Sequence, residues 1–399
     1  MKILIIHNYY RSFAASGENV VFEQERDLLI SRGHDVHTFI TRNDDWEKFG
    51  TLEKALILLE TPWSVRRYRE IRQLVRDLRP DVVHIHNIFP LISPSIFWAC
   101  NTEGVPSVLT LHNFRLICPR WFSRKGQICE KCLHSTVVWS LIHGCYKNSR
   151  IKTFIVACLI ILNRFLGTWS RKVDAFIALT EFNRSKMIEA GVPPEKIFVK
   201  PNFLSDPPRE IPDDRENYAL FLGRISPEKG LDTLLEAWRE FPGLPLHILG
   251  EGQQRGACES FAQKHKINSI HFLGRKPHSE CVERLLRARV LLMPSVCYEG
   301  FPMTVREAFA CGTPVIASRL GSLGEILEDG VTGLLFEPGN AKDLAQKVRW
   351  LWEHPEEARR MGQNARRVFE EKYTAEKNYE MLMGIYQKAI ARTHGYMSR

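Results

Sequence analysis

The sequence predicts an α/β protein of two domains, each built on a sheet of parallel strands. The chain has 399 residues, which is more than a single hydrophobic core usually serves. Short apolar runs alternate with helical stretches along its length, and this alternation is the pattern of βαβ units. Because a proline-rich and acidic stretch, 205–217, divides the halves, we expect a first domain at 1–203, a linker at 204–217, a second domain at 218–373 and a final helix at 374–399.

The composition is that of a globular protein, with 44% apolar and 25% charged residues. The apolar start, Lys2–His7, is too short for a signal peptide. The longest apolar run, Phe154–Leu162, has nine residues, whereas a bilayer requires about 20. We therefore expect a cytoplasmic protein without an export signal or a membrane span, whose ten cysteines are mostly reduced.

The first half of the chain carries the excess positive charge. Residues 1–200 contain 28 Lys and Arg and 19 Asp and Glu, a net charge of +9, whereas residues 201–399 contain 27 of each. No nucleic-acid recognition motif is visible, so we expect no nucleic-acid partner. An anionic membrane surface or a phosphate-bearing acceptor is the favoured partner, and a solvated basic face is the alternative.

Two predicted helices of this half bear on a membrane partner. One is rich in arginine, and its positive charge is offset only by Glu70 and Asp77. Its arginines are Arg66, Arg67, Arg69, Arg72, Arg76 and Arg79. The other, at 151–169, is apolar with basic flanks and could rest in a membrane interface, although burial within the domain is the favoured interpretation.

Five buried strands are expected in the first domain, and three of them end in histidine. The strands are Lys2–His7, Asp35–Ile40, Asp81–His86, Pro106–His112 and Lys172–Thr180. His7, His86 and His112 thus fall at carboxyl ends of strands, the edge at which open α/β sheets bind ligands. We expect His7 and His86 to be structural hydrogen-bonders. Gly17 follows the loop after the first strand, where the sequence alone indicates a plain helix-entry glycine before a helix at about Val20–Ser31.

The second domain is expected to begin with a strand at Tyr218–Leu222. It leads through Gly223–Gly230, with the sequence GRISPEKG, to a helix at Leu231–Glu240. Arg224 and Lys229 then flank a helix N-terminus, where unpaired N–H groups and the helix dipole favour an anion. Neither G-x-G-x-x-G after the first strand nor G-x-x-x-x-G-K-[ST] anywhere is present, which disfavours dehydrogenases and P-loop enzymes. Further strands are expected at Leu246–Leu249, Ile270–Lys276, Val290–Pro294 and Val315–Ala317.

The stretch after Val290–Pro294 combines an anion site with two carboxylates. A turn at Glu299–Pro302 leads into a helix at Met303–Ala310, and a glycine turn before a helix N-terminus favours an anion. Glu299 and Glu307 frame this site and cannot themselves bind phosphate. A ligand should therefore offer hydroxyls to the glutamates and phosphate to the backbone, and a nucleotide sugar has both.

These motifs resemble those of a known family over nearly the whole chain. Glu299–Glu307 matches the E-x7-E signature of retaining GT-B glycosyltransferases, Gly223–Gly230 matches their G-R-x4-K-G diphosphate-binding stretch, and the surrounding sequence resembles glycosyltransferase family 4. The resemblance implies two Rossmann-like domains facing an interdomain cleft, with the final helix packed back on the first domain. It also implies transfer of a sugar, with retention, from a nucleotide diphosphate-sugar in the second domain to an acceptor hydroxyl in the first.

The resemblance implies no cofactor for the chemistry and an acceptor that is lipid-linked or a saccharide. Synthesis of cell-surface polysaccharide or glycoconjugate at the inner face of the plasma membrane would suit such a reaction. Two alternatives are a GT-B type UDP-sugar epimerase and a catalytically silent scaffold that binds lipid carriers.

The resemblance also implies residue roles. Arg224 and Lys229 would offset the charge of the leaving diphosphate, Glu299 would hold hydroxyls of the donor sugar, and Glu307 would hold the ribose. His112, which follows a TLH strand, would approach the donor sugar. The remaining implied donor contacts are Gly17 near the phosphate, Lys276 near the base, and the turn residues Gly300, Phe301, Pro302, Met303 and Thr304 around the distal phosphate.

Four cysteines follow the fourth strand with the spacing C-x10-C-x2-C-x12-C. They are Cys118, Cys129, Cys132 and Cys145. A C-x2-C pair is typical of structural zinc, because both thiolates can reach one tetrahedral ion from a tight turn. The surrounding segment, 115–146, is predicted to be a long loop without a core of its own, which would need such a staple. We therefore expect a structural zinc site, with unconnected reduced cysteines as the alternative.

Overall fold

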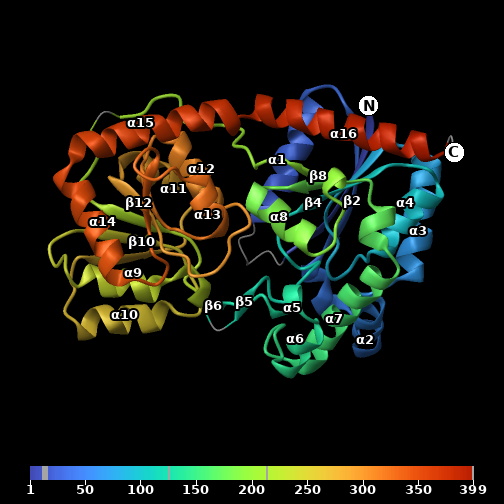
Figure 1. Cartoon of the computed structure of the whole chain (residues 1–399), viewed down its shortest axis with the longest axis horizontal. Coiled ribbons are helices and arrows are strands. Elements are labelled where there is room, and N and C mark those ends of the chain that lie inside the picture. The colour runs from blue at the N-terminus through green and yellow to red at the C-terminus, as the bar shows by residue number, and fades with distance from the viewer. Residues whose placement is uncertain (11–16, 125, 213, 398–399) are drawn as a thin grey trace. The chain divides into compact units, whose positions relative to one another are not determined.

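The computed structural model describes residues 1–10, 17–124, 126–212 and 214–397, with side chains as far as Thr393. These residues form two compact units (Figure 1). The first unit comprises Met1–Phe122, Cys129–Asn202 and the chain from Ala375 onward, and the second comprises Ser123–Ile128 and Phe203–Thr374. Each unit contains a six-stranded parallel sheet with helices between its strands, so the predicted class of two Rossmann-like α/β domains is confirmed.

The sheet of the first unit has the strand order β2-β1-β3-β4-β7-β8, and every pair is parallel. Its strands are β1 (Lys2–Tyr9), β2 (Asp35–Arg42), β3 (Val82–Asn87), β4 (Ser107–Leu111), β7 (Ala175–Ala178) and β8 (Ile197–Val199). All five predicted strands are present, and β8 is a sixth. β1 also runs further than predicted, because Asn8 and Tyr9 pair with Thr41 and Arg42 of β2 rather than entering a loop.

Helices connect these strands, and one long helix near the C-terminus also belongs to this unit. They are α1 (Gly17–Ser31), α2 (Thr51–Glu60), α3 (Val65–Leu78), α4 (Ser95–Thr102), α7 (Arg150–Phe165), α8 (Glu181–Glu189) and α16 (Ala375–Met397), with short turns η1 (Asn43–Lys48), η2 (Thr168–Lys172) and η3 (Pro194–Lys196). α1 begins at Gly17 rather than near Val20. α7 ends at Phe165, four residues before the predicted end, because Gly167 adopts a left-handed conformation with φ of 68°.

α16 belongs to the first unit and completes its core. The hydroxyl of Tyr386 lies 2.8 Å from Nδ1 of His84 on β3, and both side chains are fully buried. Arg392 donates from Nη1 to the carbonyl of Asp174 at 2.7 Å. The C-terminal helix therefore covers the sheet of the first unit and seals its central strands from water.

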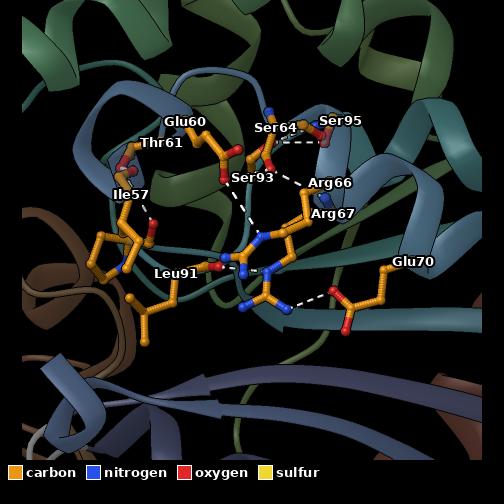
Figure 2. A network of polar contacts seen from close by, with 11 residues as sticks. Ile57, Glu60, Thr61, Ser64, Arg66, Arg67, Glu70, Leu91, Ser93 and Ser95 are labelled. Atoms are coloured by element: carbon orange, nitrogen blue, oxygen red, sulfur yellow. Dashed lines mark hydrogen bonds and ion pairs between the residues drawn. The ribbon is translucent and has the colours of Figure 1, made fainter. Parts of the chain in front are cut away.

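The arginine-rich helix is more heavily neutralised than the sequence suggested. The prediction that only Glu70 and Asp77 offset its charge was wrong, because acidic residues from other elements approach it. Figure 2 shows Arg66 facing Glu60 of α2 at 3.8 Å, and Arg67 bonded to Glu70 at 2.7 Å and to the carbonyl of Leu91 at 2.9 Å. On the next turns, Arg72 and Arg76 both bind Glu103, at 2.5 and 2.9 Å. Arg79 lies beyond the helix as its left-handed cap.

The cysteine-bearing segment is not the coreless loop that was predicted. It contains a hairpin of β5 (Ser123–Arg124) and β6 (Gln127–Ile128), then α5 (Lys131–His134) and α6 (Val138–Ile142). Phe114, Ile117, Phe122 and Val137 are buried in it. Its apolar residues are too few and too scattered to show periodicity, so this small core could not be predicted from the sequence.

The sheet of the second unit has the order β11-β10-β9-β12-β13-β14, again with every pair parallel. Its strands are β9 (Ala219–Leu222), β10 (Leu246–Leu249), β11 (Ile270–Gly274), β12 (Val290–Met293), β13 (Val315–Ser318) and β14 (Gly333–Phe336). Its helices are η4 (Pro227–Lys229), α9 (Leu231–Trp238), α10 (Arg255–Lys264), α11 (His278–Arg287), α12 (Met303–Ala310), α13 (Gly321–Ile326), α14 (Ala341–Glu353) and α15 (Pro355–Lys372). The buried Trp238 anchors the core between β9, β10 and α9.

Candidate functional site

The main candidate site lies where the strand order of the second sheet reverses. The chain runs outward from β9 through β10 and β11, then returns to place β12 on the other side of β9. Ligands of open α/β sheets bind beyond the carboxyl ends of the strands at such a reversal. Arg224 follows β9 and Glu299 follows β12, so both predicted residues lie at this point. Gly230, with φ of 70°, allows the turn before α9 to approach the backbone that follows β12. A Cβ at this position would lie 1.9 Å from the carbonyl oxygen of Pro294.

Lys229 and Glu299 form the centre of this site. Nζ of Lys229 donates to Oε1 of Glu299 at 2.7 Å, and the hydroxyl of Ser295 donates to the same oxygen at 2.6 Å. Both charged side chains are less than one-fifth exposed. Burial alone would raise the pKa of Glu299, but the ion pair with Lys229, these hydrogen bonds and the nearby Arg224 outweigh it and hold the pKa below its ordinary value. Glu299 is therefore an ionised acceptor for hydroxyl groups at neutral pH.

Arg224 presents its charge outward beside this pair. Its side chain is 63% exposed, and its nearest acidic partner in the described structure is Glu228, at 3.9 Å. Glu228 is itself bonded by the hydroxyl of Ser226 at 2.8 Å. Because this ion pair is loose and solvent-exposed, an incoming anion can compete for the guanidinium of Arg224 at little cost.

Glu307 lies one turn inside α12 and is only 7% exposed. Its Oε1 lies 3.3 Å from Nε2 of His278 at the start of α11 and 3.5 Å from Nη2 of Arg306. The hydrogen bond to Glu307 raises the pKa of His278. Arg306 is fully buried and donates to the carbonyl of Phe203. These contacts fix the carboxylate of Glu307 within a cationic environment.

The turn between the two glutamates contributes its backbone more than its side chains. α12 begins after Pro302, in extended conformation, without a side-chain cap. Phe301 is buried and its ring contacts Tyr373 at 5.5 Å, and the hydroxyl of Thr304 contacts the sulfur of Met293 at 3.3 Å. Such inward-facing side chains suit the prediction that main-chain groups of this turn meet a phosphate.

Lys276 follows β11, the edge strand of the sheet. Its Nζ pairs with Glu280 of α11 at 3.2 Å, and both side chains are about one-third exposed. The predicted contact of Lys276 with a nucleotide base stays a prediction.

In the first unit, the predicted His112 is the outer member of a buried polar chain. Nε2 of His112 lies 3.1 Å from Nδ1 of His86, and Nε2 of His86 lies 3.2 Å from the carboxylate of Glu25. Glu25 in turn binds the ammonium of Lys200, and both are fully buried. Either imidazole can donate in the His86–His112 hydrogen bond; a proton on Nε2 of His86 would make Nε2 of His112 the donor and leave Nδ1 of His112 as an acceptor. Burial and the neighbouring imidazoles lower the pKa of His112 well below its ordinary value, so the ring is neutral at pH 7.

A second polar cluster lies around the start of α1, where Gly17 is the first residue. Asn113, which follows His112 in the sequence, donates from its side-chain amide to the carboxylate of Glu18 at 2.6 Å. Arg115 lies in the same cluster and donates to the hydroxyl of Tyr10 at 3.4 Å. Burial raises the pKa of Glu18 in spite of Arg115 and Asn113. The carboxyl ends of β1 and β4 therefore carry hydrogen-bonding groups suited to a polar ligand.

Two groups of side chains are candidates for holding a metal ion. Glu25, His84 and His86 place ligand atoms within 4.8 Å of one another. The ammonium of Lys200 already donates to the carboxylate of Glu25, so it supplies the positive charge that a metal ion would otherwise bring to this group. The four predicted cysteine ligands lie between β4 and α7, and Cys118 and Cys132 among them are buried.

Comparison with known proteins decides the family. Residues 16–206 match the family model Glycosyltransferase Family 4, and residues 204–368 match the model Glycosyl transferases group 1. A protein of Methanocaldococcus jannaschii named uncharacterized glycosyltransferase MJ1178 is 35% identical over 397 residues, covering 97% of this chain and 98% of the relative. The chain belongs to the family 4 type of GT-B glycosyltransferases.

Solved structures agree on the fold of this glycosyltransferase. Anabaena Alr3699/HepE, crystallised with UDP, superposes with a TM-score of 0.65 at 18% identity, over 99% of this chain and 100% of the other. Sucrose-phosphate synthase of Thermosynechococcus elongatus superposes with a TM-score of 0.69 at 20% identity, over 98% and 99% of the two chains. The predicted GT-B fold is confirmed.

Several residues of this glycosyltransferase's sites were not found from its sequence. Ser295 stands directly after an apolar strand and is indistinguishable from a turn serine until its bond to Glu299 is seen. His278 and Arg306 are 29 and 1 positions from Glu307, and only the packing of α11 against α12 brings the histidine to it. Glu25 looked like a surface residue of an amphipathic helix, and its partner Lys200 is 175 positions away.

Proposed function

We propose that this glycosyltransferase moves a sugar from a nucleotide diphosphate-sugar to an acceptor hydroxyl, with retention at the anomeric carbon. The observation that carries the proposal is the Lys229–Glu299 pair beside the exposed Arg224 at the sheet reversal. A diphosphate would take up the charge of Arg224 and Lys229, which would also offset the negative charge that grows on the leaving group. The UDP in the HepE complex supports a nucleoside diphosphate as the ligand type.

Within this proposal, the two glutamates have different partners. Glu299, ionised and held by Lys229 and Ser295, would accept hydrogen bonds from hydroxyls of the transferred sugar. Glu307, set deeper on α12, would accept those of the ribose, with main-chain groups of residues 300–304 at the distal phosphate and Lys276 near the base. The cationic pair would make a metal ion unnecessary for leaving-group departure. Front-side attack assisted by the leaving diphosphate would account for retention.

The first unit would supply the acceptor site. His112 is proposed to meet the donor sugar through Nδ1, and Gly17 to lie near the donor phosphate. The acceptor hydroxyl would use the polar groups around Glu18 and Asn113 at the ends of β1 and β4. A lipid-linked or saccharide acceptor, in cell-surface polysaccharide or glycoconjugate synthesis, would suit the net charge of +9 in residues 1–200.

An apolar surface of the first unit supports a membrane-bound site of action. Of the sixteen large hydrophobic side chains that are exposed among the described residues, ten lie on α2, α6 and α7. They are Leu52, Leu56, Leu59, Val138, Trp139, Ile142, Ile151, Phe154, Ile161 and Phe165, which we call the α2–α6–α7 face. The three helices are neighbours, since α6 packs on α7 and Asn163 of α7 donates to the carbonyl of Pro62 just after α2 (Figure 1). The predicted burial of α7 within the domain is therefore right for the side that carries Val156, Leu159 and Ile160, and wrong for the opposite side.

The charge around this face favours an anionic lipid surface. α6 and α7 contain no acidic residue, and Arg150, Lys152 and Arg164 of α7 are exposed beside the apolar stripe. α2 adds Lys54 but also the acidic Glu53 and Glu60, so the positive charge of the face lies on α7. Phe165 is 86% and Ile151 77% exposed, so they can enter the headgroup layer without rearrangement. Each basic residue near such a surface contributes roughly 1 kcal/mol. No helix in the described part of the chain is long and apolar enough to cross a bilayer.

Product analysis tests the reaction. The enzyme is incubated with a panel of UDP-, GDP- and TDP-sugars, with and without lipid-linked and saccharide acceptors, and products are analysed by mass spectrometry and by NMR of the anomeric proton. We expect donor consumption that depends on acceptor and a linkage with the donor's configuration. Conversion of a UDP-sugar without acceptor would instead identify an epimerase, and an inverted linkage would contradict retention.

Vesicle flotation tests the membrane proposal. We expect wild-type protein to float with anionic vesicles at low salt, and Phe154→Ser with Phe165→Ser to remain in the soluble fraction. Ile30→Ser, an exposed apolar residue of α1 outside the face, is the matched control and should float. Wild-type protein that stays soluble with anionic vesicles at low salt would refute the membrane proposal and leave the proposed reaction untouched.

A further inference from the structure

The four cysteines of the segment between β4 and α7 are grouped around one buried pair. Cys118 and Cys132 are 5% and 4% exposed, and their thiols are hydrogen-bonded to each other. Cys129 and Cys145 lie within electrostatic range of Cys132. Two of the four sulfur atoms are thus in contact, and the other two lie near this pair in the first unit.

The sulfur of Cys118 lies in a nest of main-chain donors. The N–H groups of Arg120, Trp121 and Phe122 lie within hydrogen-bonding reach of it, and that of Trp121 also donates to the carbonyl of Cys118 at 3.2 Å. Trp121 and Phe122 adopt left-handed conformations, with φ of 55° and 63°, which turn successive amides toward one point. A concave set of amides of this kind stabilises an anion, and here the atom at its centre is a sulfur that can become a thiolate.

The turn after Cys145 has the same unusual backbone. Lys147 and Asn148 are left-handed, with φ of 51° and 52°. Of the six non-glycine residues with positive φ in the described chain, four lie in these two turns, two to four positions after the first and the last cysteine of the set. A left-handed residue other than glycine costs about 1–3 kcal/mol and persists only where its surroundings impose it. Such strain in both turns indicates that the surrounding structure holds the backbone near Cys118 and Cys145 in a defined conformation.

Two hydrogen bonds tie the turns together. Arg120 donates from Nη1 to the carbonyl of Cys145 at 3.2 Å and to the side chain of Asn148 at 3.1 Å. The N–H of Cys129 donates to the carbonyl of Phe122 at 2.8 Å, which closes the hairpin on the first turn. The segment therefore holds its cysteines by backbone geometry as well as by its few buried apolar residues.

We propose that Cys118, Cys129, Cys132 and Cys145 bind one structural Zn²⁺ ion. Four thiolates and no open position are the donor set of a closed tetrahedral zinc site, with Zn–S distances of about 2.3 Å. No three of the four sulfurs lie within 4.8 Å of one another in the described structure, so Cys129 and Cys145 would close on the Cys118–Cys132 pair when the ion binds. Zinc would cross-link the start of the segment to the residues just before α7, and so fix the base of the α2–α6–α7 face.

Metal analysis of the whole protein tests the proposal independently of catalysis. Protein purified without chelator or affinity metal is analysed by inductively coupled plasma mass spectrometry, and the metal is then exchanged for Co²⁺. We expect one zinc per chain and, with cobalt, the visible and near-ultraviolet bands of a tetrahedral tetrathiolate. Cys132→Ser should lower bound zinc at least tenfold, and Cys158→Ser, a half-buried cysteine of α7 outside the set, should leave it at one per chain.

If Cys132→Ser does not fold, cobalt absorption of the wild-type protein decides the question alone. Absence of zinc with all four thiols reacting in the native protein would overturn the proposal. So would iron in place of zinc, or disulfides detected as a mass 2 Da lower per bond.

Discussion

Replacing Lys229 with methionine should affect both the stability of the second unit and its binding of nucleoside diphosphates. The substitution removes the ammonium 2.7 Å from Glu299 and leaves a carboxylate that is only 16% exposed without its main partner. Breaking a buried ion pair from one side costs roughly 3–5 kcal/mol, and we expect the lower end because Ser295 still donates to Glu299. Adding Glu299→Gln should restore most of this stability, since no unpaired buried charge then remains.

Arg224 offers the contrast that makes this prediction specific to binding. Its side chain is 63% exposed and its ion pair with Glu228 is long, so Arg224→Ala should change the free energy of unfolding by less than about 0.5 kcal/mol. A charge-assisted contact to a diphosphate contributes about 1.5–3 kcal/mol, so either Arg224→Ala or Lys229→Met should weaken binding roughly tenfold to a hundredfold. Arg239→Ala, another exposed arginine paired with a nearby glutamate, is the matched control.

Urea unfolding and isothermal titration calorimetry with UDP, GDP and TDP separate the two effects. We expect Lys229→Met to lose stability and affinity, Arg224→Ala to lose affinity alone, and Arg239→Ala to lose neither. If Arg224→Ala binds every nucleoside diphosphate as the wild type does, and Lys229→Met loses stability only, the pair is structural and the proposed donor site is wrong.

Other perturbations give equally definite expectations. Glu299→Gln should mainly lower kcat and leave affinity for the sugar-free nucleoside diphosphate within about threefold, whereas Glu307→Gln should weaken that affinity; the opposite pattern in calorimetry and kinetics would exchange their roles. Glu25→Gln should destabilise the first unit by roughly 3–5 kcal/mol in urea unfolding, because it leaves the ammonium of Lys200 buried without its carboxylate, and an unchanged midpoint would contradict the ion pair. Acidification from pH 7 to 5 should destabilise the first unit, because burial lowers the pKa of His7 to about 3 and that of His84 well below its ordinary value. In the unfolded chain histidines take up protons below about pH 6.5, whereas these two stay neutral in the folded protein. Each of them therefore lowers the free energy of unfolding by up to about 1.4 kcal/mol per pH unit. A free energy of unfolding that is flat between pH 7 and 5 would show that these rings are already protonated in the folded protein.

The sequence was sufficient for ten of the twelve strands of the two sheets and for the motifs of the proposed donor site, for a physical reason. Strands buried on both faces, such as β3 and β12, are continuous apolar runs, and the turns after them carry the local signals of glycine and proline. Arg224, Lys229, Glu299 and Glu307 could be found because each lies within a short motif that contains its own structural context.

Contacts between distant segments could not be found in this way. Glu103 neutralises arginines of α3 from about 30 positions away, so the arginine content of that helix overstated its free charge. Phe154 and Phe165 looked like core residues because apolar composition does not say which side of a helix is covered, and only the packed structure shows that one stripe is bare. The series of buried polar contacts from Lys200 through Glu25 and His86 to His112 likewise joins distant segments, so only tertiary packing reveals it.

A crystal structure of the enzyme with a bound nucleoside diphosphate would show whether the ends of β9 and β12 form the donor site. We expect the distal phosphate within hydrogen-bonding distance of Arg224 and Lys229, and the ribose hydroxyls on Glu307. A nucleotide bound away from the ends of β9 and β12, with these three side chains untouched, would contradict this expectation.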